Sequence, residues 1–131
     1  YVMEHQYFKA IGRTGDVDRL LAESESALHR LGTPTTDRGR QTYRDLHMLR
    51  AYSFATRKQA DQALAEIDLV IAAGPQDCQP WFAAAEIRIH FKRDLERVEA
   101  FIDKGEVQAD FPDERREAEA LRAKLKAARG P

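Results

Sequence analysis

The sequence contains few of the residues that define several protein classes. Its one cysteine, Cys78, cannot form a disulfide within the chain; this excludes a disulfide-stapled fold without fixing the compartment. No apolar run approaches the roughly 20 residues that a membrane-spanning helix needs. Lys and Arg number 21 against 22 Asp and Glu, which argues against a general polyanion-binding surface. The chain begins at Tyr1 and not at Met, so we expect a soluble fragment of a longer protein.

The residues that are abundant favour helices. Hydrophobic residues make up 43% of the chain and charged residues 33%, with many Ala, Leu, Glu, Arg and Lys. These residues have high helix propensity, and this much apolar content argues against disorder. No stretch alternates between apolar and polar residues as a half-buried strand does. The composition therefore predicts an all-α fold.

Helix-breaking residues divide the chain into segments. The breaks lie at Gly12 to Gly15, in the loop 32–40, at Gly74-Pro75 and at Phe111-Pro112. Between them, apolar residues at helical spacing predict helices at about 2–13, 17–31, 39–57, 60–73, 81–91 and 94–110, with a last helix at 113–129. The residues expected to cap these helices are Asp16, Thr36 or Asp37, Asp77 or Gln79, and Asp94. Gly105 is expected to fray or kink the helix that contains it.

Three turn segments repeat along the chain. Residues 15–23 read GDVDRLLAE, 58–66 read KQADQALAE and 92–100 read KRDLERVEA. The step from the first segment to the second is longer than the next step, and the long loop 32–40 accounts for the excess. Two helices in a period of about 34 residues resemble the tetratricopeptide repeat. Small and large residues of the second unit match that family's pattern at Ala63, Ile67 and Pro75, and Trp81 matches its first-helix aromatic. His47 and Arg97 depart from the pattern.

The resemblance implies an α-α superhelix in one domain, 1–131. Its hairpins would be approximately 2–31, 39–73 and 79–110, followed by a capping helix at 113–129. Each hairpin alone has too little surface to bury its apolar face, so neighbouring hairpins would stack. The competing interpretation is an unrelated α-helical bundle.

The resemblance also implies a concave groove lined by the first helix of each hairpin. Such a groove could hold a peptide or a helix from a partner protein. The alternative is that several of these side chains, Met48 among them, belong to the core. The predicted partner-binding residues are His5, Lys9, Met48, Tyr52, Phe82, Glu86 and His90.

No group of residues predicts catalysis. The four histidines lack metal-ligand spacing, and Cys78, expected in a loop, has no nearby base in the sequence. Glu86 and His90 are one helical turn apart. This spacing predicts a hydrogen bond between the two side chains rather than a general base. A basic run from Arg38 to Lys58 could attract an acidic or phosphate-bearing partner, but predicts first a solvated face that pairs with acids such as Asp61 and Glu66.

We therefore expect a non-enzymatic protein-interaction module with no cofactor, no metal and no nucleic-acid partner. The alternative is a structural segment that docks against a neighbouring domain or a second copy, so a homo-oligomer is possible.

Overall fold

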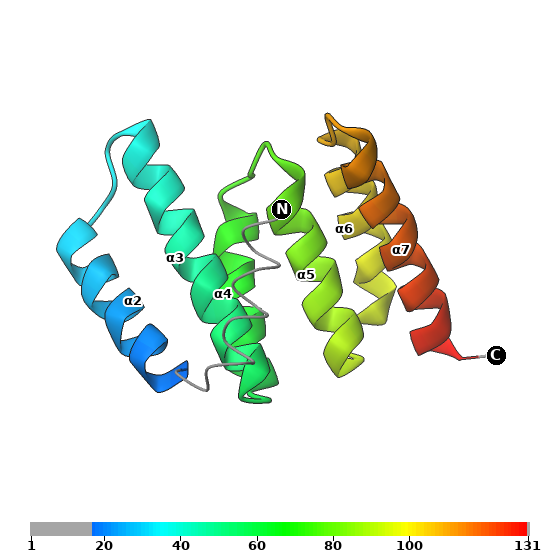
Figure 1. The fold of residues 1–131 in the computed structure, drawn as a ribbon, viewed down its shortest axis with the longest axis horizontal. Helices are drawn as coiled ribbons and strands as arrows, with labels where there is room; N and C mark the ends of the chain where they lie inside the picture. The colour runs from blue at the N-terminus through cyan, green and yellow to red at the C-terminus, as the bar shows by residue number, and fades with distance from the viewer. Residues whose placement is uncertain (1–16, 131) are drawn as a thin grey trace. The chain divides into compact units, whose positions relative to one another are not determined.

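The computed structural model describes residues 17–130, which form six α-helices and no strand (Figure 1). The all-α prediction is confirmed. The predicted helix 2–13 and the predicted cap Asp16 lie outside the described residues. The described chain divides into two compact units, 17–70 and 71–130, and each is described by itself. The prediction of a single domain stays a prediction.

The first unit contains α2 (Val17–Leu31), α3 (Asp37–Thr56) and most of α4 (Ala60–Ala72). Helix α2 ends at Gly32, whose φ of 64° only glycine adopts without strain. Helix α3 begins two residues before the predicted Gly39, because the Thr36 hydroxyl accepts a hydrogen bond of 3.0 Å from the Gly39 N–H. Helices α2 and α3 pack together, and α4 lies beside α3 in Figure 1.

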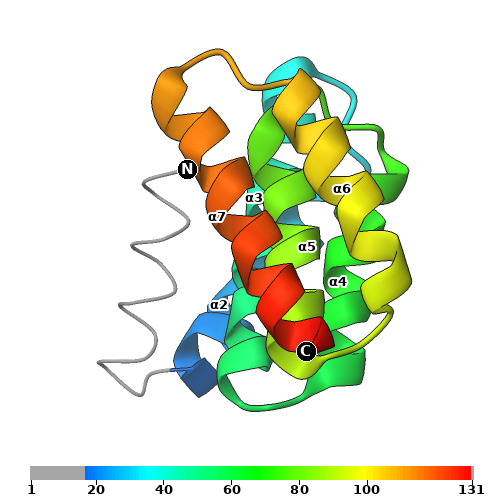
Figure 2. The ribbon, with the colours of Figure 1, turned by 90° about the vertical axis from the view of Figure 1, so that its right-hand side faces the viewer.

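The second unit contains α5 (Cys78–Phe91), α6 (Leu95–Val107) and α7 (Pro112–Arg129). The Asp77 carboxylate caps α5 by accepting a hydrogen bond from the Gln79 N–H at 3.0 Å. The three helices pack pairwise on one another, and Figure 2 shows α6 and α7 both lying against α5. Their fully buried side chains include Phe82, Ile87, Val98, Ile102, Leu121 and Leu125.

Helix α6 corrects two predictions. It passes through Gly105 and ends at Val107, before the predicted limit near Phe111. A Cβ at Gly105 would lie 2.5 Å from the buried Phe82 ring, so glycine is needed here for close packing between α5 and α6. Asp94 precedes α6, but its side chain makes no capping hydrogen bond, because its backbone is left-handed with φ 50°.

The turns within the α3–α4 and α5–α6 hairpins have the same hydrogen bonds at equivalent positions of the sequence repeat. Lys58 N–H donates to the Ala55 carbonyl, and Gln59 N–H donates to the Phe54 carbonyl. Lys92 and Arg93 donate in the same way to Ile89 and Arg88. Lys58 and Lys92 both have left-handed backbone, with φ of 62° and 53°. This pattern is the Schellman motif that ends many helices, and it shows that the sequence repeat is also a repeat of local structure.

Candidate functional site

The predicted groove residues are mostly buried where the structure describes them. Met48 and Tyr52 on α3 are 3% and 5% exposed, and Phe82 on α5 is 2% exposed. Glu86 is half-buried and His90 is exposed, both on α5. His5 and Lys9 lie outside the described residues. Partner binding by these seven residues stays a prediction.

Phe82 and His90 pack against residues of their own unit. The Phe82 ring occupies the space that the missing side chain of Gly105 leaves open. The His90 ring meets Phe91 edge-on, with the ring centroids 4.8 Å apart. In the second unit, therefore, the solvent-facing members of the predicted groove are Glu86 and His90, and Phe82 supports the helix that carries them.

The basic run from Arg38 to Lys58 is largely engaged in local pairs. Arg40 bonds to Asp37, and Arg57 Nη1 lies 2.6 Å from Asp18 Oδ1 on α2. Arg50 points inward: its side chain is 14% exposed, and its Nε donates to Glu66 Oε1 at 3.0 Å. The contacts of Arg57 and Arg50 join α3 to α2 and α4. The pairs of Arg40 and Arg57 support the interpretation of the run as a solvated face paired with acids, whereas Arg50 is partly buried against Glu66, one of the two acids the sequence suggested.

Glu66 on α4 is the centre of a partly buried polar cluster. Its second oxygen lies 2.5 Å from Nδ1 of His47, so that one carboxylate accepts from two α3 side chains. Arg50 Nη1 also donates hydrogen bonds to the Leu21 carbonyl and to Ser24 Oγ on α2, at 3.2 and 3.3 Å. Burial alone would raise the pKa of Glu66, but the hydrogen bonds from His47 and Arg50 outweigh it and lower the pKa. The cluster joins three helices through an ionised carboxylate.

Cys78 does not lie in a loop, as the sequence suggested, but begins α5 and is buried. Its Sγ donates to Glu114 Oε2 on α7 at 3.0 Å. Burial and then the Glu114 carboxylate raise the pKa of the thiol to about 12, so that the reactive thiolate is suppressed at neutral pH. The other oxygen of Glu114 accepts from the backbone N–H groups of Asp110 and Phe111. Glu114 thus caps α7 and fixes α7 to α5.

Arg122 on α7 forms a second cross-helix cluster, with acids of α6. Its guanidinium donates to Glu106 at 2.9 and 3.0 Å and to Asp103 at 2.8 Å. These partners raise the pKa of Arg122, and the hydrogen bond from Arg122 lowers that of Glu106. The sequence predicted a capping helix here and missed the role of Arg122 in joining α7 to α6. A signal was present, because Asp103 and Glu106 are three residues apart and share one helix face.

Two large apolar side chains near the α6–α7 connection face solvent, which the sequence did not predict. Val107 is 82% exposed and Phe111 is 65% exposed. Phe111 stands directly before α7, where short polar residues are preferred, and the Glu114 carboxylate accepts hydrogen bonds from the backbone N–H groups of Asp110 and Phe111. Local structure therefore gives no reason for phenylalanine at this position.

Residues 17–130 contain no group of three His, Cys, Asp or Glu side chains arranged to hold a metal ion. In the same range, no helix has the length and apolar character needed to cross a bilayer. Comparisons with protein-family models, curated proteins and solved structures return no match.

Proposed function

We propose that this chain is a non-enzymatic protein-interaction module of tetratricopeptide-like hairpins that binds a peptide or helix of a partner protein. The observation that carries the proposal is the identical turn at Lys58 and Lys92, at equivalent positions of the sequence repeat. It supports the resemblance seen in the sequence, and the step from fold to function is an analogy with that family.

The partner-contacting surface would include the solvent-facing edge of α5. His90 and Glu86 lie one turn apart there, and both can form hydrogen bonds with a peptide backbone or side chain. Met48, Tyr52 and Phe82 would act as the packed support that keeps the first helices rigid. Rigid support lowers the conformational entropy lost on binding.

Selection of random peptides displayed on phage tests this proposal. Peptides enriched on the natural protein should lose about tenfold in affinity for His90→Ala and for Glu86→Gln, the loss expected when a bound partner's hydrogen bond is removed. His29→Ala and Glu96→Gln are matched controls at exposed positions on α2 and α6, and should bind normally. Failure to enrich any peptide, or equal binding by all four variants, would contradict the proposal.

The second candidate function is a structural segment that docks against a neighbouring domain. The exposure of Val107 and Phe111 favours it, because large apolar side chains at a chain reversal are well placed to enter a pocket. Measured affinity for free peptides supports the first function. Self-association or docking without any peptide requirement supports the second.

A further inference from the structure

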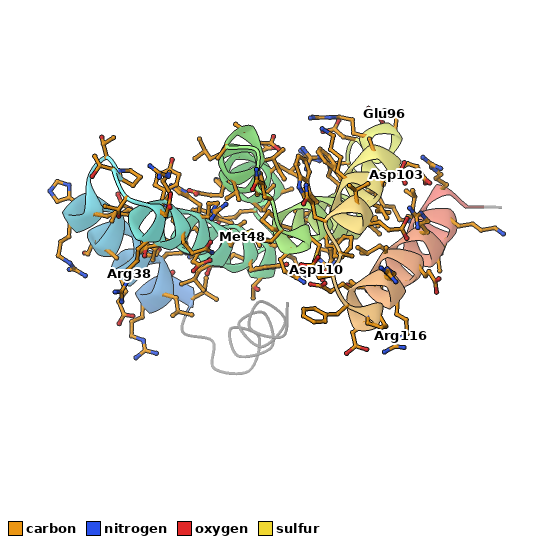
Figure 3. All side chains as sticks on the ribbon, turned by 90° about the horizontal axis from the view of Figure 1, so that it is seen from above. Arg38, Met48, Glu96, Asp103, Asp110 and Arg116 are labelled. Carbon is orange, nitrogen blue, oxygen red and sulfur yellow. The ribbon has the colours of Figure 1, made fainter. Side chains whose placement is uncertain are left out.

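We draw no further inference here: the strongest candidate, the surface patch of exposed Val107 and Phe111 at the α6–α7 connection, is flanked by exposed side chains of opposite charge, Arg115 and Asp110 (labelled in Figure 3), and nothing in the structure shows what covers it.

Discussion

Glu66 shows how one buried acid joins several helices. His47 and Arg50 are three residues apart on α3, so they share one face and both reach the same carboxylate. The ionised form accepts both hydrogen bonds, whereas a protonated carboxyl offers poorer acceptors to two cationic or N–H donors. The side chain of Glu66 is only 14% exposed, so solvent replaces these bonds poorly when they are lost.

The lowered pKa of Glu66 predicts acid sensitivity. In the unfolded chain this group titrates near 4.5, and in the folded protein it titrates lower. Its contribution to the free energy of unfolding is therefore complete above pH 4.5 and is lost as the pH falls through the lower folded pKa. Glu66→Gln should reduce stability at pH 7 by about 1–3 kcal/mol and flatten the loss between pH 5 and 3. Urea denaturation at each pH measures both effects.

Glu23→Gln is the matched control for this titration, because Glu23 is exposed on α2. The control should keep the natural stability at pH 7 and the natural acid sensitivity. Equal pH profiles for the natural protein and Glu66→Gln would show that the cluster does not govern acid sensitivity. Glu106 and Glu114 also have lowered pKa values from their hydrogen bonds to Arg122 and Cys78, so part of the sensitivity should remain.

The sequence predicted the apolar core better than the polar contacts. Ala63 and Ile67, which match the repeat pattern in the sequence, are fully buried. The role of His47 at Glu66 was missed, because spacing within α3 does not reveal which side chain meets an acid of α4. Cys78 was placed in a loop, because the sequence left Asp77 and Gln79 as alternative caps, and the observed cap is Asp77.

Helix boundaries were predictable where a residue has one dominant effect on the backbone. Thr36, Asp77 and Gly32 end or begin helices as expected, because capping oxygens and positive φ act locally. The end of α6 was predicted wrongly. The helix runs through Gly105, against which the Phe82 ring packs, and it ends at Val107.

The turn between α5 and α6 can be stabilised by one substitution. Lys92 occupies the position of the Schellman motif that glycine prefers, with φ 53°. Left-handed backbone costs a residue with a Cβ about 1–2 kcal/mol, and the greater freedom of glycine in the unfolded chain removes part of the gain. Lys92→Gly should therefore raise the free energy of unfolding by about 0.5–1 kcal/mol. A shift of the urea midpoint at constant slope measures the gain.

Arg93→Gly is the control for this turn. Arg93 is the next residue and has no positive φ, so glycine there adds unfolded-state freedom without relieving strain. It should lower the urea midpoint or leave it unchanged. A fall in the midpoint of Lys92→Gly as well would mean that the left-handed conformation costs little in this turn.

At the scale of the whole molecule, the internal repeat is the feature about which the sequence was most informative. The turns at Lys58 and Lys92 are equivalent in sequence and in hydrogen bonding, so the step between them describes a structural unit. The repeat does not determine which helix faces remain exposed to solvent. Met48 and Tyr52 were expected to line a groove and are buried, because the sequence period places a residue on a helix face without showing what covers that face.

In repeat proteins a terminal helix covers the apolar surface of the last hairpin, and α7 has this place against α5 and α6. Leu121 and Leu125 are 0% and 1% exposed. Burying a leucine contributes about 1.5–3 kcal/mol, and the apolar surface of α5 and α6 that they cover would also meet water. Ending the chain at residue 111 should therefore lower the free energy of unfolding by at least about 4 kcal/mol. Urea denaturation followed by circular dichroism measures this loss.

The chain that ends at residue 111 also tests whether the α5–α6 hairpin needs α7 for its stability. Losing the cover should reduce the helical signal by more than the share of α7, because α5 and α6 would lose packing that short helices need in water. A chain ending at Arg129 keeps every contact of α7 with Leu95, α5 and α6, and should match the natural protein. If the chain ending at residue 111 unfolds at the natural urea midpoint, the α5–α6 hairpin is stable without its cover and the repeat unit is self-sufficient.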